Sequence, residues 1–330
     1  MNTKRIISLV ASLALVLSLS VGLTGCGDKA AQDDNQGSTD GEGTKYTVGI
    51  CQLVQHEALD AATQGFIDAL NEALPGQVEF QNKNASGDNA NCSTIVNGFV
   101  SDGVDLIMAN ATGALTAAGD IPILGTSITA YGVALDLDDF NGTVGGNISG
   151  TSDLADLGKQ ANMISEWFPE AKKVGLLFCS AEPNSRYQIE EVAKYLSDKG
   201  IETQEFAFTD TNDVASVTQS AADYSDVVYV PTDNTAASNT EAIANVLVPA
   251  GVPAICGEEG ICKGCGVATL SISYYDLGVT TGKMAAKILT GEADISEMPI
   301  EFTEATPKYN ASMCETLGIE PLEGYTAIEE

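Results

Sequence analysis

Polar side chains follow several predicted strands of this 330-residue chain, at the points where the strands end. They are hydroxyls, amides and carboxylates, and several stand where helices are predicted to begin. Backbone N–H groups at a helix N-terminus suit a carboxylate, whereas Glu182, Asp233 or Glu258 could offset an ammonium. The mixture predicts a zwitterionic ligand such as an amino acid. The candidate ligand-binding residues are Gln55, His56, Thr112, Thr126, Ser127, Glu182, Asn184, Ser185, Asp233, Asn234 and Glu258.

The alternative is that these side chains serve only their own helices, because Ser, Thr, Asp and Asn are ordinary N-caps. Catalysis has little support. His56 is the single histidine, and no Gly-x-Ser-x-Gly nucleophile elbow accompanies it, so we expect His56 to cap a helix or line a cleft. The segment GVTTGKM (278–284) has its glycines one residue too close for a phosphate loop. The chain is therefore predicted not to be an enzyme, and no cofactor is expected.

Eight cysteines are present, and three of them cluster at Cys256, Cys262 and Cys265. A Cys-x-x-Cys pair with a third cysteine nearby could bind zinc, but no histidine or fourth cysteine is close in sequence. A disulfide or free thiols are the alternatives, and the spacing leaves them open. No metal site is predicted.

The composition excludes some partners. The chain has 15 basic and 46 acidic residues, a net charge of −31 and a pI near 4.1. Such a balance argues against nucleic acid and against anionic lipid headgroups as ligands. Hydrophobic residues make up 44% of the chain, and its length from Lys45 onward is enough for two lobes of ordinary size.

The N-terminus carries the pattern of a secretory signal peptide over residues 1–25. Lys4 and Arg5 form a basic region, and residues 6–17 form an apolar stretch. That stretch is shorter than the roughly 20 apolar residues that a membrane-spanning helix needs. We therefore exclude this segment from the folded protein.

The segment Leu23-Thr24-Gly25-Cys26 resembles the bacterial lipobox. By that resemblance, Cys26 is lipidated and becomes the mature N-terminus; the alternative is a signal peptide that is cleaved elsewhere. Residues 26–44 are then a flexible, polar tether with almost no apolar content. The predicted location is the extracytoplasmic face of a bacterial cell membrane, with the protein held there by its lipid.

The elements that position the candidate residues alternate between short β-rich runs and helical patterns from Tyr46 onward. The rhythm predicts parallel sheets with right-handed crossovers. In such sheets ligands bind beyond the carboxyl ends of the strands, which is where the candidate residues lie. A glycine-rich stretch at 131–150 interrupts this alternation of strands and helices, which resumes after it.

Two Rossmann-like α/β lobes joined by a hinge are therefore predicted, in preference to one large doubly wound sheet. The first lobe is placed at 45–148 plus about 270–292, and the second at 149–269 plus about 293–330. Two such lobes with a crevice between them suit capture of a ligand by hinge closure.

Six segments cover most of 46–302, namely GICQLVQHEALDAATQGFIDAL, VDLIMANAT, NISGTSDL, AEPNSRYQIEEV, YVPTDNTAAS and VATLSISYYDLGVTTGKMAAKIL. PTDNT and YYDLG together are the most specific. These segments resemble the ABC-transporter substrate-binding proteins of the tryptophan/tyrosine-binding-like family, which have the type I periplasmic-binding fold.

The resemblance implies a small ligand, an amino acid or a related compound with aromatic amino acids among the candidates, that is delivered to a membrane permease driven by an ATPase. An extracytoplasmic sensing module for a signalling partner is the alternative. Two departures affect the cleft: TSITA (126–130) stands where the family often has Asp-Pro, and GEEGICKGC (257–265) brings added cysteines. The residues that match the family's motifs are His56, Thr112, Glu182, Asn184, Ser185, Asp233 and Asn234.

Overall fold

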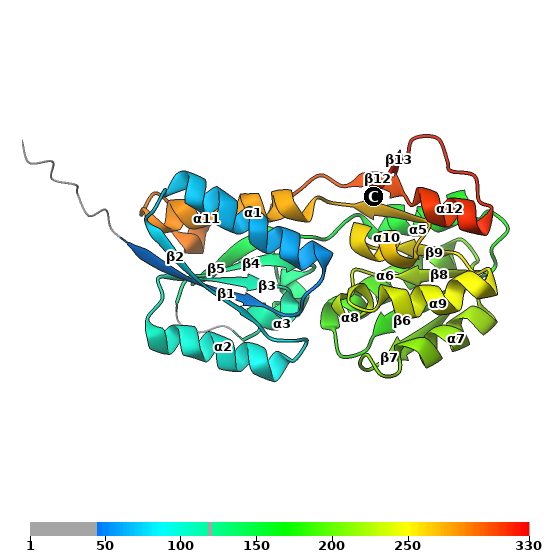
Figure 1. Cartoon of the computed structure of the whole chain (residues 1–330), viewed down its shortest axis with the longest axis horizontal. Helices are drawn as coiled ribbons and strands as arrows, with labels where there is room; N and C mark the ends of the chain where they lie inside the picture. The colour runs from blue at the N-terminus through cyan, green and yellow to red at the C-terminus, as the bar shows by residue number, and fades with distance from the viewer. Residues whose placement is uncertain (1–44, 118–120, 330) are drawn as a thin grey trace, which may run out of the picture. The chain divides into compact units, whose positions relative to one another are not determined.

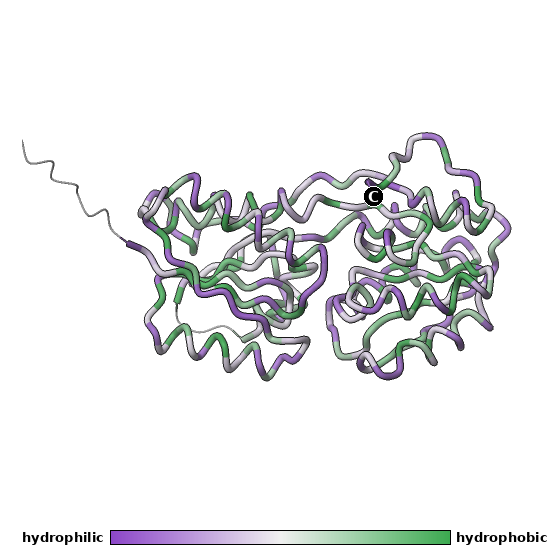
Figure 2. The backbone as a smooth tube through the Cα atoms, in the orientation of Figure 1, coloured by the Kyte–Doolittle hydropathy of each residue, from purple (hydrophilic) through white to green (hydrophobic). Residues whose placement is uncertain are grey.

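Short runs rich in Val, Ile and Leu form the strands of two sheets, each covered by helices on both faces (Figure 1). This computed structural model describes residues 45–117 and 121–329. Hydrophobic residues concentrate along the central strands of both sheets, where they form the cores (Figure 2). The two-lobed α/β architecture that the sequence predicts is confirmed.

The first lobe contains a six-stranded parallel sheet in the order β11-β5-β4-β3-β1-β2. Its strands are β1 (Tyr46–Gln52), β2 (Val78–Asn84), β3 (Leu106–Asn110), β4 (Ile123–Ile128), β5 (Ile148–Ser152) and β11 (Glu301–Phe302). Its helices are α1 (Glu57–Ala73), α2 (Asn89–Asp102), α3 (Thr112–Leu115), α4 (Tyr131–Ala134), α11 (Tyr274–Leu289) and the 3₁₀ turn η1 (Ile295–Glu297).

The second lobe contains a seven-stranded sheet in the order β13-β12-β10-β9-β8-β6-β7, in which only the β10–β12 pair is antiparallel. Its strands are β6 (Lys173–Cys179), β7 (Glu202–Phe208), β8 (Val227–Val230), β9 (Ala254–Cys256), β10 (Ala268–Ser271), β12 (Thr306–Tyr309) and β13 (Thr326–Ala327). Its helices are α5 (Leu157–Trp167), α6 (Pro183–Asp198), α7 (Val214–Tyr224), α8 (Asn234–Ala237), α9 (Thr240–Ala250), α10 (Glu259–Cys265) and α12 (Ala311–Leu317).

The chain passes between the two sheets at three places, after β5, after β10 and after β11. Two of these crossovers differ from the sequence prediction. Residues 149–152 and 301–302 were expected in the second lobe, but they pair within the first sheet. The reason is that β5 (ISGTS) lacks the apolar run of a typical buried strand and β11 has only two residues, so neither gave a clear strand signal.

Helices α1 and α11 pack closely, and together they position the start of each helix at the cleft. Glycines permit this approach: a Cβ atom at Gly278 would lie 2.0 Å from the carbonyl oxygen of Ala62, and one at Gly65 would lie 2.1 Å from that of Tyr275. The buried face of α1 contributes Phe66 and Leu70 to the core of the first lobe. The conformational cost of two mid-helix glycines is therefore offset by close contact.

Among the described residues, none of the helices combines the length and apolar character required to cross a bilayer. The predicted signal peptide (1–25), the lipidated Cys26 and the tether (26–44) lie outside the described residues.

Candidate functional site

A small cavity lies where the carboxyl ends of strands from both sheets meet. We call it the inner cavity. Six of the candidate residues line it, namely His56, Ser127, Asn184, Asp233, Asn234 and Glu258. The remaining lining residues are Leu59, Thr129, Asp153, Thr232, Ala237 and Tyr274.

The other candidate residues lie outside the inner cavity. Gln55 is exposed, and Thr112 is buried at the start of α3. The hydroxyl of Thr126 faces Thr151 and Thr281, at 3.2 and 3.1 Å, in a buried cluster that joins β4, β5 and α11. Ser185 is buried on α6, and Glu182 is buried at the N-cap of the same helix. Neither residue lines the inner cavity.

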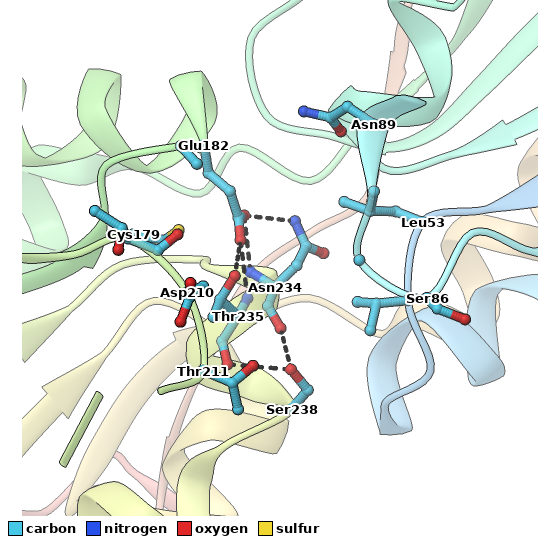
Figure 3. Close-up of a pocket in the computed structure, with 14 residues that line it drawn as sticks. Leu53, Ser86, Asn89, Cys179, Glu182, Asp210, Thr211, Asn234, Thr235 and Ser238 are labelled. Carbon is cyan, nitrogen blue, oxygen red and sulfur yellow. Dashed lines mark hydrogen bonds between the residues drawn. The ribbon is translucent and has the colours of Figure 1, made fainter. Parts of the chain in front are cut away.

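A wider pocket lies beside Glu182 (Figure 3). Asn234 lines both pockets. Glu182 does not present a free carboxylate there. Its Oε2 accepts hydrogen bonds from the backbone and side-chain nitrogens of Asn234, at 2.9 and 2.8 Å. Its Oε1 accepts from the backbone nitrogen and hydroxyl of Thr235, at 2.8 and 2.7 Å. Glu182 therefore fixes the start of α8.

Asp233 is the N-cap of α8 and is also engaged by backbone donors. Its Oδ1 accepts from the Ala236 nitrogen at 2.8 Å, and its Oδ2 accepts from the Cys179 nitrogen at 2.7 Å. Burial, together with the negative charge of Glu182, raises the pKa of Asp233 to about 8, and these backbone bonds oppose the rise. Both carboxylate oxygens thus have partners before any ligand arrives.

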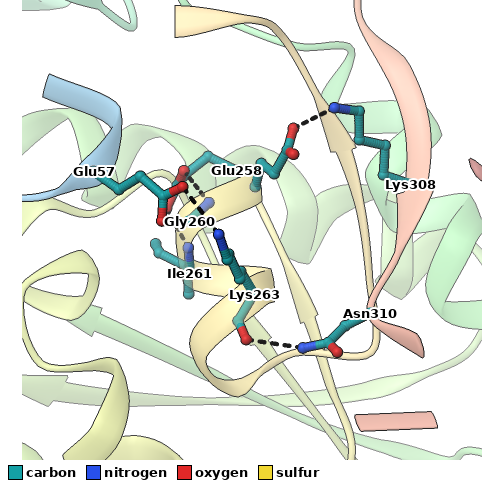
Figure 4. Close-up of polar contacts among 8 residues, drawn as sticks. Glu57, Glu258, Gly260, Ile261, Lys263, Lys308 and Asn310 are labelled. Carbon is teal, nitrogen blue, oxygen red and sulfur yellow. Dashed lines mark hydrogen bonds and ion pairs between the residues drawn. The ribbon is translucent and has the colours of Figure 1, made fainter. Parts of the chain in front are cut away.

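Glu258 is the N-cap of α10 and repeats this arrangement (Figure 4). Its carboxylate accepts from the backbone nitrogens of Gly260, at 2.7 Å, and Ile261, at 2.5 Å. Burial raises the pKa of Glu258 to about 7. All three carboxylates that the sequence suggested as partners for an ammonium therefore also cap helices, which is the alternative that N-cap preferences left open.

Asp153 is a cavity-lining carboxylate that the sequence reasoning missed. It is only 5% exposed, and its Oδ2 accepts a hydrogen bond of 2.9 Å from the hydroxyl of Tyr274. Its Oδ1 is buried and has no hydrogen-bond partner among the described residues. Burial raises the pKa of Asp153 to about 6, and the nearby hydroxyls of Tyr274 and Thr129 oppose the rise. Asp153 directly follows β5, so recognition of that strand would have placed it among the candidates.

Ser127 contributes a second unpartnered polar atom to the inner cavity. Its Oγ is buried without a hydrogen bond to any described residue, and its backbone has a φ of 55°. Ala111, at the end of the neighbouring strand β3, has a φ of 83° and a ψ of 158°, which non-glycine residues rarely adopt. Strained backbone of this kind concentrates at ligand sites, where the surrounding structure holds it.

Two contacts join the lobes at the start of α1. Nε2 of His56 lies 3.3 Å from Oδ1 of Asn234, and burial lowers the pKa of His56. The exposed ammonium of Lys263 lies 3.3 Å from Oε1 of Glu57 (Figure 4). The inner cavity is thus enclosed between lobes that touch at its rim.

All seven cysteines in the described part of the chain are buried free thiols. Burial raises the pKa of Cys262, as it does that of Cys256, so both are neutral and serve as small apolar residues. Within residues 45–117 and 121–329, no group of three or more potential metal ligands is arranged to hold an ion.

Comparison with known proteins gives consistent matches. Residues 47–323 match the family model of ABC transporter substrate binding proteins. A tyrosine-binding protein of Clostridioides difficile (strain R20291) is 33% identical over 321 residues, which cover 92% of this chain and 89% of that protein.

Two solved structures are also similar. The ABC domain of Streptococcus pneumoniae in complex with L-Trp is 29% identical, with a TM-score of 0.81 over 86% of this chain and 100% of that chain. The ligand-free, open structure of a Clostridium difficile substrate binding protein with adhesive properties is 32% identical, with a TM-score of 0.65 over 86% and 99%. The lower score against an open structure agrees with the contacts between the lobes seen here.

Proposed function

Because the chain belongs to the ABC transporter substrate-binding proteins and has the type I periplasmic-binding fold, we propose that it captures an aromatic amino acid in the inner cavity and delivers it to a membrane permease driven by an ATPase. The family comprises solute-binding proteins and not enzymes. The observation that carries the proposal is the enclosed inner cavity, which polar residues from both lobes line.

The chemistry of the lining supports a zwitterionic ligand. Asp153 offers a carboxylate to an ammonium, while the hydroxyl of Ser127, which has no partner among the described residues, offers a neutral hydrogen-bond donor to a carboxylate. Leu59 and Ala237 add apolar surface, and Tyr274 adds an aromatic ring. The relatives support the aromatic class, since one is called a tyrosine-binding protein and another holds L-Trp.

Capture proceeds by hinge closure in this proposal. The three crossovers allow the lobes to separate, which breaks the contacts from His56 to Asn234 and from Glu57 to Lys263. A ligand that contacts both lobes binds the closed state more tightly than the open state, and so shifts the equilibrium towards closure. The lining residues come from both lobes, as such a ligand requires.

ABC substrate-binding proteins act outside the cytoplasm. We further propose that a lipid on Cys26 anchors the protein to the cell membrane, with 26–44 as its tether and 1–25 as the signal peptide that is removed.

Calorimetric titration of the folded domain with L-tyrosine, L-tryptophan and L-phenylalanine tests the function, with myo-inositol as the uncharged comparison ligand. We expect saturable binding of at least one of the amino acids and none of the inositol. Small-angle scattering should show a smaller radius in the saturated protein. Binding of inositol alone, or of none of the amino acids, would contradict the proposal.

A further inference from the structure

We propose that Asp153 is the residue that binds the ligand's ammonium group and thereby selects amino acids over the corresponding acids without an amine. This inference rests on the proposed function, because it takes the ligand to be an amino acid. It assigns the charge recognition to the crossover after β5 and not to the helix-capping carboxylates of the second lobe.

The first observation is the unsatisfied oxygen. Asp153 is 5% exposed and lines the inner cavity, yet its Oδ1 has no hydrogen-bond partner in the described part of the chain. A buried charged acceptor without a partner is costly, so native proteins retain one mainly where something else supplies the partner. Ser127 Oγ, also unpartnered within the described residues, lines the same cavity. Two such atoms around one cavity indicate that a polar ligand supplies the hydrogen-bond partners that both atoms lack.

The second observation concerns the other carboxylates of the lining. Both oxygens of Asp233 accept backbone hydrogen bonds, as do both oxygens of Glu258. Their charge is spread over helix N-termini, which are favourable places for it. Asp153 caps no helix, and its Oδ2 is held by a hydroxyl, that of Tyr274.

The third observation concerns charge. Of the described residues, no lysine or arginine is among those that line the inner cavity. The compensating positive charge must therefore arrive with the ligand, and a primary ammonium has the donors to pair with a single free carboxylate oxygen. Tyr274 acts as a positioning residue, because its hydroxyl holds Oδ2 at 2.9 Å and leaves Oδ1 for the ligand.

The experiment compares ligands that differ only in their charged groups. L-Tyrosine carries both groups, desaminotyrosine lacks the ammonium, and tyramine lacks the carboxylate; L-tryptophan, indolepropionic acid and tryptamine form a second set. Each is titrated calorimetrically into the wild-type protein, Asp153→Asn and Asp156→Asn. Asp156 is the matched control, since it is an exposed aspartate of the same crossover that caps α5 and lies outside the inner cavity.

We expect the wild type and Asp156→Asn to bind the amino acid at least about a hundredfold more tightly than the acid without an amine. Asp153→Asn should lose amino-acid affinity on that scale and keep its weak affinity for desaminotyrosine, so that discrimination disappears. Asparagine retains an acceptor for Tyr274, and circular dichroism checks that the variant is folded.

Two results would overturn the inference while leaving the proposed function intact. One is a wild type that binds desaminotyrosine or indolepropionic acid as tightly as the amino acid, which needs no variant to observe. The other is a folded Asp153→Asn that binds the amino acid within about threefold of the wild type, far short of the loss expected for a buried pair.

Failure of the proposed function gives a different pattern. If the wild type binds no aromatic amino acid, the same titrations with tyramine, tryptamine and the remaining common amino acids decide the inference. Binding of any of these that Asp153→Asn abolishes would support Asp153 as an ammonium site for another ligand. Binding of none of them would overturn the inference together with the function.

Discussion

The hydroxyl of Tyr274 donates a hydrogen bond of 2.9 Å to Oδ2 of Asp153, and this bond joins two of the three segments that cross between the lobes. Asp153 follows β5, where the chain leaves the first sheet, and Tyr274 begins α11, where it returns. The bond therefore lies where a hinge motion and a bound ligand would meet. Its removal should affect binding through the charge of Asp153.

Tyr274→Phe removes the hydroxyl and keeps the aromatic ring. The carboxylate of Asp153 then loses its hydroxyl partner, so its pKa should rise further above the present value of about 6. We expect about tenfold weaker amino-acid binding at pH 7, on the scale of one hydrogen bond to a charged group, with partial recovery at pH 8, where the carboxylate ionises again. Calorimetry at both pH values measures this. A loss independent of pH would indicate that the hydroxyl acts by positioning Asp153, and not through the charge of its carboxylate.

The stability of the ligand-free protein should fall as pH rises. The pKa values of Asp153, Glu258 and Asp233 are raised to about 6, 7 and 8, so the folded state holds these protons more tightly than the unfolded chain does. Their contribution is fully present below about pH 4 and is lost as the pH rises through 6 to 8. His56 opposes this trend, because burial lowers its pKa and the folded state holds that proton less tightly than the unfolded chain does. A few exposed carboxylates with lowered pKa values also oppose it, but solvent screens them.

Thermal unfolding between pH 4.5 and 8.5 measures this dependence. Asp153→Asn should flatten part of the curve and raise the free energy of unfolding at pH 8 by on the order of 1–3 kcal/mol, because a costly buried charge is gone. Glu258→Gln should not show this gain in the free energy of unfolding, since the carboxylate of Glu258 caps α10 through two backbone hydrogen bonds. Lower stability of Asp153→Asn at pH 8 would mean that the carboxylate is structural.

Much of this fold can be predicted from the sequence, because its apolar strands and amphipathic helices have clear periodic patterns of hydrophobic residues. The strand β5 cannot be recognised in this way, since the segment ISGTS is short and polar. Asp153 follows β5, so it was not predicted as a site residue either. The positions of His56, Asn184 and Asn234 followed from their place after strands, and the structure brings them to one cavity. Their roles did not follow, because the same residue types cap helices, and only three-dimensional contacts show which oxygens remain free.

The exposed ion pair between Lys263 and Glu57 should contribute little to closure. Its side chains are 39% and 66% exposed, so solvent and salt screen the attraction. Lys263→Ala should change ligand affinity by less than about threefold, and affinity should vary little between low and moderate salt. A tenfold loss in Lys263→Ala would instead identify the pair as a latch. Calorimetric titration at two salt concentrations separates these outcomes.

Cys26 lies outside the described residues, and its lipidation is tested in cells. Cys26→Ala should release the protein from the membrane fraction or leave it unprocessed, because in the proposed function the acyl chains on Cys26 supply the anchor. Fractionation and gel mobility of the variant measure this. A variant that sediments and migrates like the wild type would rule out the lipid anchor.

Gly278 should be the most sensitive position of the contact between α1 and α11. A Cβ atom there would lie 2.0 Å from the carbonyl oxygen of Ala62, so Gly278→Ala must push the helices apart. We expect a loss of about 1–3 kcal/mol in the free energy of unfolding, as overpacking typically costs. Ligand affinity should fall as well, since Tyr274 starts α11 and His56 precedes α1.

Gly98→Ala provides the matched control, because Gly98 is also inside a helix, α2, but a Cβ atom there would meet no described heavy atom within 4 Å beyond the backbone of its own helix. Alanine is the better helix former, so this variant should gain about 0.5–1 kcal/mol and bind ligand like the wild type. Chemical denaturation and calorimetry of both variants measure the difference. If Gly278→Ala is as stable as Gly98→Ala, the close approach of α1 and α11 does not hold the cleft, and the positions of His56 and Tyr274 must depend on the sheets beneath them.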